Sequence, residues 1–286
     1  MTTPDYLTLN RANWDDRAAA HAASKGYDVD TLASGARELS GVVAFDRPRL
    51  GDIAGLDIVH LQCHIGTDTL SLARLGGRLT GLDLSPRSLE QARTIGQRAG
   101  IPIDYVESDV YAGPEALGGR TFDLVYTGIG ALCWLPSVAR WADVVDRLLR
   151  PGGRLFIREG HPMLWALDER HEDNPVVGFP YFEQAEGTVW TEGGTYVETD
   201  HAFTANTTVE WNHGLGEIVT ALLDRGLVLT GLVEHDSVPW CALPGQMTED
   251  ADGEWRLTDR PERLAASYTL QAVKPRTQGL PIGSIQ

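Results

Sequence analysis

Four short loops hold the residues whose types and spacing could do chemistry, and each follows a β-prone run. The first is the turn His60-Leu-Gln-Cys-His-Ile-Gly-Thr-Asp68, which leads into a helical pattern. Backbone groups in such a turn can approach a ligand closely, and a helix N-terminus favours a negative group such as a carboxylate. The second loop begins at Asp83, which is placed to accept hydrogen bonds from both hydroxyls of a ribose.

The remaining two loops complete the pattern. The third follows Asp109, whose carboxylate can accept from an adenine amine, and the fourth is Thr127-Gly-Ile-Gly130, whose small residues let a reacting group come close. An acidic residue at the end of a strand is more often solvated or capping a helix, so each loop alone is weak evidence. The order and spacing of all four together indicate a nucleoside site.

Alternating strand and helix patterns position these loops. The β-prone runs are 58–61, 78–84, 102–106, 122–126, 154–158, 227–233 and 268–273, and the helical patterns are 69–75, 86–100, 138–149 and 215–223. This alternation predicts an α/β fold: a doubly wound, Rossmann-like, mostly parallel seven-stranded sheet with helices on both faces. The last two runs flank the loop-like stretch 236–266 and can form an antiparallel pair at the sheet edge.

Two segments do not follow this alternation. Residues 1–50 precede the main domain at 51–286, and residues 163–212 lie within it. Residues 1–50 read as two or three short helices, which either close over the ligand as a lid or pack on the sheet or on a second subunit. The aromatic-rich segment 163–212 reads as a cap inserted after the fifth strand. Within it, the sequence around Gly193 predicts a hairpin between 188–191 and 195–199.

Composition narrows the class of function. A formal net charge of −16 and a pI near 4.8, with no polybasic patch, argue against nucleic acid or membrane partners. The three cysteines are widely spaced, which indicates neither a disulfide framework nor a zinc site. His60 and His64 lie in a strand-to-turn segment, so we expect no metal there. Without a basic and apolar leader, a cytoplasmic location is expected.

At these loops the chain resembles the class I S-adenosylmethionine-dependent methyltransferases. Gly81-Leu-Asp-Leu-Ser, Glu107-Ser-Asp-Val, Phe122-Asp-Leu-Val-Tyr and Leu149-Arg-Pro-Gly-Gly-Arg-Leu look like the family's second to fifth motifs. The likeness covers residues 55–160 well and 215–275 in outline. It implies S-adenosyl-L-methionine as cofactor, S-adenosyl-L-homocysteine as product and a small-molecule methyl acceptor, at oxygen or nitrogen rather than carbon. A homodimer stays open.

The first motif departs from the family's pattern of an acidic residue followed by three glycines. Here His60 replaces the acid, Gln62 and His64 replace two glycines, and Gly66 remains. This string is similar to a variant loop, LQCHxGxDT, found in a subgroup of bacterial small-molecule methyltransferases. We expect Gln62 and His64 to hydrogen-bond the methionine carboxylate or amine. The expected cofactor-binding residues are Gln62, Cys63, His64, Gly66, Asp83, Leu84, Asp109, Val110 and Thr127, together with Trp14 and Tyr27 as contacts from the N-terminal lid.

Methyl transfer requires a general base only if the acceptor must lose a proton. His161 and His213 are the candidate catalytic residues, with Glu159 as a third; His161 can instead be a turn residue and His213 a cap or packing residue. Two other classes remain open. A nicotinamide-dependent dehydrogenase would need Gly-x-Gly-x-x-Gly in the first loop, which this sequence lacks. A binding or regulatory protein could keep the fold without transfer.

Overall fold

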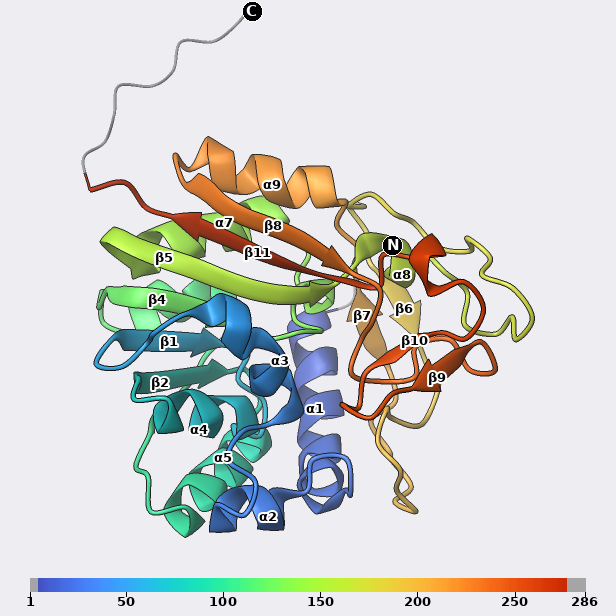
Figure 1. Ribbon diagram of the computed structural model, residues 1–286, viewed down its shortest axis with the longest axis horizontal. Helices are drawn as coiled ribbons and strands as arrows, with labels where there is room; N and C mark the ends of the chain where they lie inside the picture. Colours follow the sequence, from blue (N-terminus) through green and yellow to red (C-terminus); the bar gives the residue numbers. More distant parts are fainter. Residues whose placement is uncertain (1–4, 277–286) are drawn as a thin grey trace, which may run out of the picture.

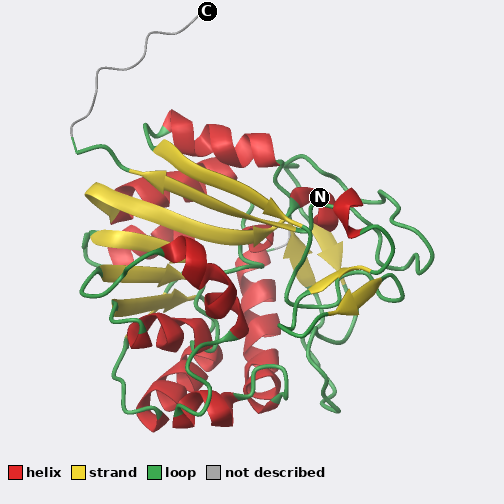
Figure 2. Ribbon diagram, in the orientation of Figure 1, coloured by secondary structure: helices red, strands yellow, loops and turns green. Residues whose placement is uncertain are grey.

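A computed structural model describes residues 5–276 of the chain. At its centre is a seven-stranded sheet in the order β3-β2-β1-β4-β5-β11-β8, with helices on both faces (Figures 1 and 2). β1 to β5 pair in parallel, whereas β11 runs antiparallel to both of its neighbours. The doubly wound α/β class predicted from the sequence is confirmed, and so is the antiparallel pair at the edge.

The elements have the following bounds. The strands of the sheet are β1 (Asp57–Leu61), β2 (Arg78–Asp83), β3 (Asp104–Glu107), β4 (Phe122–Thr127), β5 (Leu149–Gly160), β8 (Val228–His235) and β11 (Ser267–Val273). The short strands are β6 (Thr188–Trp190), β7 (Thr208–Glu210), β9 (Met247–Glu249) and β10 (Trp255–Leu257). The α-helices are α1 (Tyr6–Ala23), α2 (Val29–Ser34), α3 (Gly41–Leu50), α4 (Thr67–Arg74), α5 (Pro86–Arg98), α6 (Gly113–Ala116), α7 (Val138–Leu148), α8 (Pro162–Trp165) and α9 (Leu215–Asp224).

The helices form where the local sequence favours them. α5 begins at Pro86, and the hydroxyl of Ser85 caps it by accepting from the backbone N–H of Ser88 at 3.0 Å. α7 turns one apolar face to the sheet, where Trp141 and Leu148 are fully buried. Burial of this face is the main source of its stability. Over the described residues, no helix combines the length and apolar character that crossing a membrane requires.

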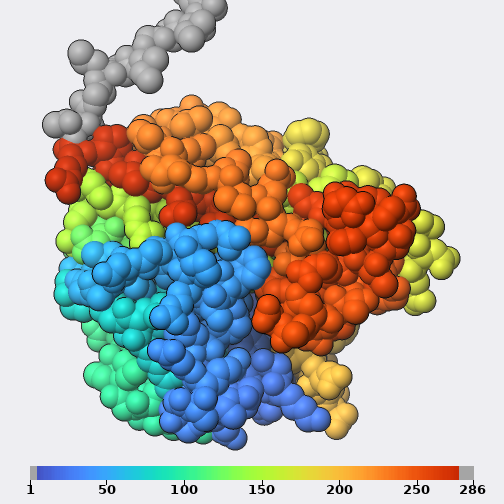
Figure 3. All heavy atoms as spheres, in the orientation of Figure 1, coloured from blue at the N-terminus to red at the C-terminus, as the bar shows by residue number. Residues whose placement is uncertain are grey.

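The N-terminal segment contains one helix much longer than the short ones predicted. α1 spans 18 residues and packs against α5 and β7 beside the carboxyl edge of the sheet (Figure 1). Figure 3 shows the N-terminal segment in blue next to the segment 236–266 in orange and red. A buried ion pair helps to join these parts, because Arg158 on β5 contacts both the ring of Phe45 and the carboxylate of Glu254.

The cap differs from the prediction in its strand pairing. The expected hairpin around Gly193 is wrong, because β6 pairs with β7 and residues 191–207 form an irregular loop between them. The stretch 236–266 also holds more structure than a loop, since β9 and β10 form an antiparallel pair. Its apolar side chains share a core with the start of the cap: Leu164, Leu167, Val238, Leu243, Met247, Leu257, Leu264 and Ala266.

Candidate cofactor site

The turn after β1 adopts a backbone that side chains rarely take. Gln62, His64 and Gly66 have φ angles of 54°, 50° and 77°, all in the left-handed region. Gly66 is required for a second reason, because a Cβ there would lie 2.7 Å from the Cβ of Ala92 and 2.6 Å from the hydroxyl of Tyr105. The turn therefore has a backbone shape that glycine favours while it presents two side chains.

Asp83 at the tip of β2 holds this turn in place. Its carboxylate accepts from the backbone N–H of His64 at 2.7 Å and from that of Ser85 at 2.8 Å. Burial raises the pKa of Asp83 to about 6, although both of these hydrogen bonds act in the opposite direction. Nearby, the thiol of Cys63 is buried, which raises its pKa. Asp83 thus sits in contact with the turn, as the sequence predicts.

Among the buried polar atoms that have no partner within the described part of the chain, two lie at strand tips beside the turn. Gln62 donates through Nε2 to the carbonyl of Ala131 at 2.9 Å, but its Oε1 is buried and unpaired. The hydroxyl of Thr127, at the tip of β4, is also buried and unpaired. Thr127 on β4 lies in register with Leu61 on β1, and Gln62 directly follows Leu61. The two unpaired atoms therefore belong to residues at the ends of neighbouring strands. Buried polar groups normally have partners, and leaving one unpaired costs about 1–3 kcal/mol.

The third strand brings Asp109 to the same edge. The backbone N–H of Ser108 donates to the carbonyl of Asp83 at 3.0 Å, which fixes the tips of β2 and β3 side by side. The carboxylate of Asp109 is half-buried and caps the following 3₁₀ turn through the N–H of Tyr111 at 3.2 Å. Leu84, which follows Asp83, is half-buried, and Val110, which follows Asp109, is buried.

Helix α1 lies against this edge. The carboxylate of Asp15 accepts from the Ser85 hydroxyl at 2.6 Å and from the backbone N–H of Arg87 at 3.2 Å, at the N-terminus of α5. The neighbouring Trp14 ring lies 5.1 Å from the rings of both His64 and Trp134. The structure therefore shows α1 in contact with the turn and with the loop after β4.

A chain of five polar side chains connects α1, the turn and the cap. His64 lies 3.2 Å from His21 through Nε2 and 3.2 Å from the hydroxyl of Tyr27 through Nδ1. His21 continues to the hydroxyl of Thr195 at 2.6 Å, and Tyr27 continues to that of Tyr196 at 2.5 Å. Burial lowers the pKa of His21 to about 4 and also lowers that of His64, so both rings are neutral at pH 7.

The side chains expected as bases are engaged elsewhere. His213 is buried, with Nδ1 2.8 Å from Glu183 Oε2 and Nε2 2.8 Å from the carbonyl of Leu135. Both partners accept hydrogen bonds, so both ring nitrogens are occupied as donors. Neither nitrogen is therefore free to act as a base toward the molecule that is methylated. His161 caps α8 through Nδ1, and its Nε2 lies 2.9 Å from a carboxylate oxygen of Glu234.

Glu159, the third candidate base, shapes the loop after β4. Its two oxygens accept from the backbone N–H groups of Gly130, Ala131 and Leu132 at 2.6–2.8 Å. Burial raises its pKa, while these bonds act to lower it. Both carboxylate oxygens of Glu159 therefore already accept hydrogen bonds from this loop. The role that the structure shows for Glu159 is to hold the loop in position.

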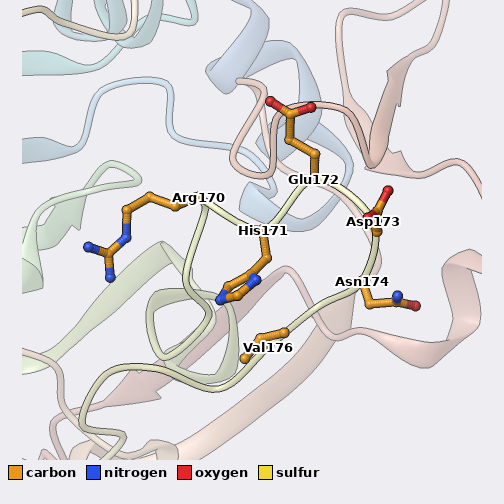
Figure 4. A pocket seen from close by; sticks show the side chains of 6 residues that line it. All are labelled: Arg170, His171, Glu172, Asp173, Asn174 and Val176. Carbon is orange, nitrogen blue, oxygen red and sulfur yellow. The ribbon is translucent and has the colours of Figure 1, made fainter.

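Within the described residues there are two hollows that no residue of the turn lines. One, about 10 Å³ and large enough for a single water, is lined by Glu159, His213 and the unpaired polar atoms of Trp211 and Tyr268. The other, about 380 Å³, lies on the exposed loop 170–176, where the labelled side chains point in different directions (Figure 4). Groups of three or more potential metal ligands are not found within residues 5–276.

Several residues that contact the site have no signal in the spacing of the sequence. His21, Thr195 and Asp15 touch the turn or its neighbours, yet none follows a predicted strand. Asp68 ends the turn in the sequence, and its carboxylate lies 3.6 Å from where a Cβ on Gly128 would stand. The signal available for α1 was a helical repeat of polar residues, which resembles a solvent-facing stripe.

Comparison with known proteins supports one family. A family described as "Methyltransferase domain" matches residues 59–157. A ubiquinone biosynthesis O-methyltransferase of Methylobacterium is 35% identical over 36% of this chain and 41% of its own length. One of Xanthomonas oryzae is 35% identical over 54% of this chain and 64% of its own. The chain thus matches less than two thirds of the length of these relatives.

Solved structures share the fold. An S-adenosylmethionine-dependent methyltransferase of Mesorhizobium loti aligns with a TM-score of 0.52 at 22% identity, covering 82% of this chain and 97% of that one. One of Methanosarcina mazei aligns with a TM-score of 0.52 at 17% identity, covering 80% and 98%. The chain therefore shares the fold of these methyltransferases, and residues 59–157 match a methyltransferase domain.

Proposed function

We propose that this protein transfers a methyl group from S-adenosyl-L-methionine to an oxygen or nitrogen atom of a small molecule. The observation that carries the proposal is the pair of unpaired polar atoms, Gln62 Oε1 and Thr127 Oγ1, on neighbouring strand tips. The methionine end of the cofactor has both an ammonium donor and a carboxylate acceptor, so it can satisfy an amide oxygen and a hydroxyl together. The residues present therefore fit this cofactor.

The other cofactor contacts follow from the same edge. We assign the ribose to Asp83 and the adenine to Asp109, with Leu84 and Val110 beside the ring. His64 and Cys63 border the methionine end, and Gly66 keeps the turn's shape. Helix α1, with Trp14, acts as the lid together with Tyr27. Because Asp15 contacts Ser85 beside Asp83, we expect α1 to move away from the N-terminus of α5 when the cofactor enters.

The sulfonium supplies an electrophilic methyl group when the cofactor is bound. The chain's contribution is to align the acceptor with the methyl–sulfur axis and to exclude water, which can lower a barrier by about 7–11 kcal/mol. A base would add about 10²–10⁴-fold if the acceptor carries a proton. His213 and Glu159 would each need to exchange a hydrogen-bond partner before serving as that base. Among the described residues, His161 Nε2 has no hydrogen-bond partner and lies 2.9 Å from a carboxylate oxygen of Glu234.

A small-molecule acceptor is supported by the cap and the charge. Residues 163–212 lie beyond the carboxyl end of β5, where open α/β sheets bind ligands, and the net charge of −16 disfavours nucleic acid. We place the lid at 1–50 and the methyltransferase domain at 51–286, of which residues 1–4 and 277–286 lie outside the described part of the chain, and we place the protein in the cytoplasm. Similarity to relatives named ubiquinone biosynthesis O-methyltransferases favours methyl transfer over the non-catalytic and dehydrogenase alternatives. The same names favour oxygen as the atom that is methylated.

Binding of S-adenosylhomocysteine, measured by calorimetry and thermal shift, tests the cofactor assignment. We expect the ligand at 100-fold its Kd to stabilise the protein by about 2.7 kcal/mol, and NAD to give no shift. Asp83→Ala should weaken binding at least about tenfold, through loss of the ribose contact and of the turn's brace. Asp104→Ala, an exposed acid on β3, serves as the matched control. Equal binding by both variants would remove Asp83 from the site.

Transfer itself is tested with cofactor carrying a labelled methyl group. The protein is incubated with panels of phenols, carboxylic acids and amines, and label in each product is counted. We expect label in one class of oxygen or nitrogen acceptor. Binding of the cofactor without transfer to any panel member would favour the binding-protein alternative.

A further inference from the structure

Helix α1 has an unusual buried face, since its interior residues are mostly polar. The buried positions are Asn10, Asn13, Arg17, Ala18 and His21, at helical spacing. Burying such groups is unfavourable unless each finds a hydrogen-bond partner. The partners of this face therefore show what the helix is built to hold.

Most of these partners are backbone groups of the cap, on β7 and in the loop that precedes it. Asn10 exchanges two hydrogen bonds of 2.9 Å with the N–H and C=O of Val209. Arg17 donates to the carbonyl of Gly194 at 2.8 Å and to that of Ala205 at 3.0 Å. Asn13 adds a bond of 2.9 Å to the same Ala205 carbonyl. Because the loop between β6 and β7 has no sheet ladder, α1 replaces the missing strand partner.

Asp16 adds further bonds to the same loop. Its carboxylate accepts from the backbone N–H of Thr204 at 2.6 Å and of Ala205 at 3.0 Å. The guanidinium of Arg17 also lies over the ring of Phe203, with 4.4 Å to its centroid. Contacts of several kinds along one helix face therefore hold residues 194–209 to α1.

The opposite end of the same face reaches the cofactor turn. His21 contacts His64 on one side and Thr195 of the cap on the other. A neutral imidazole donates from one nitrogen and accepts at the other, so a change at either partner of His21 alters the bond to the second. One helix thus contacts the turn and the cap at once.

We propose that Arg17 is a positioning residue through which α1 couples the cofactor turn to the cap: when the turn holds the cofactor, α1 is docked and the loop 194–209 is ordered over the acceptor. The inference rests on the proposed function. It implies that cofactor binds before the acceptor pocket is complete. Arg17 contacts neither the turn nor the loop after β4 in the hydrogen bonds it makes, so its action is through the cap backbone.

Hydrogen exchange of the full chain with and without S-adenosylhomocysteine tests the coupling. In the unmodified protein we expect the ligand to slow exchange of amides 62–66 and also of amides 194–209, by about tenfold or more. In Arg17→Gln the ligand should still protect 62–66 but no longer 194–209. Arg170→Gln, an exposed arginine of the cap paired with Asp168, is the matched control and should behave as the unmodified protein.

Thr195→Val provides a second variant that leaves the Arg17 contacts intact. It removes the hydroxyl next to His21 and should reduce ligand-induced protection of 194–209 while leaving the fold unchanged. The outcomes separate the two proposals. Failure of the unmodified protein to bind S-adenosylhomocysteine overturns the proposed function. Binding that protects the turn alone, or undiminished cap protection in Arg17→Gln, overturns the coupling.

Discussion

Helices α7 and α1 are both largely buried on one side, yet they are held by different forces. α7 buries Trp141, Val145 and Leu148 against the sheet, whereas α1 buries Asn10 and Arg17 against loop backbone. The apolar side chains of α7 would be exposed to water, at a cost in free energy, if that helix left the sheet. The hydrogen bonds of α1 can be replaced by hydrogen bonds to water. α7 therefore supports the fold through apolar burial, whereas α1 depends on hydrogen bonds that water could replace, so we expect α1 to be the more mobile of the two helices.

Removal of Trp141 should have the largest effect on stability. The side chain is fully buried in the main core, so Trp141→Ala should lower the free energy of unfolding by about 3–5 kcal/mol. Urea unfolding followed by circular dichroism measures this. A loss below about 1 kcal/mol would mean that α7 is no more firmly held than α1.

Acid should release α1 before α7. Burial holds the pKa of His21 near 4, below its usual 6.5, so His21 contributes docking energy above pH 6.5 that is lost as pH falls towards 4. The full loss is about 3 kcal/mol. Exchange of α1 amides should therefore accelerate between pH 6.5 and 4, while that of α7 amides changes little after correction for intrinsic rates.

Hydrogen exchange measured at α1 distinguishes the effect of His21 from that of other titrating groups. Asp83 has a pKa raised to about 6, so it stabilises the fold as pH falls from 6 to its usual 3.8, and global melting would mix both effects. Local exchange separates them. His21→Gln should flatten the response of α1; an unchanged response would assign the acid sensitivity to another group, such as His64.

A smaller effect is expected for Arg17→Ala. It leaves the carbonyls of Gly194 and Ala205 without this donor, at a cost of about 1–3 kcal/mol that water at the exposed loop will reduce. Limited proteolysis should show faster cleavage within 191–207, with the unfolding midpoint nearly unchanged. Cleavage at the rate of the unmodified protein would place the loop's order elsewhere.

The sequence predicts α7 and the sheet well because their apolar side chains recur with the period of helix or strand. The same reasoning fails for α1, since a polar stripe containing Asn10, Asn13 and Arg17 looks like a face turned to water. The hairpin at Gly193 was wrong for a related reason. The turn signal is local, whereas the backbone of that loop is held by α1, nearly 180 residues away in the chain.

At the site, spacing was sufficient to bring Asp83 and the turn together, because successive parallel strands end at one edge. Spacing could not find His21, which comes long before the turn and reaches it only through the packing of α1. Nor could it show that His213 has both ring nitrogens occupied, since Glu183 and Leu135 come from distant segments.

The left-handed backbone at Gln62 and His64 has a consequence for how Asp83 variants behave. Such a conformation costs a side-chain-bearing residue about 1–2 kcal/mol, and the bond from the His64 N–H to Asp83 opposes its relaxation. Loss of that carboxylate should let residue 64 return towards extended angles. Asp83 substitutions would then alter the outline of the methionine end as well as the ribose end, so a glycine at position 64 is expected to restore part of what they remove.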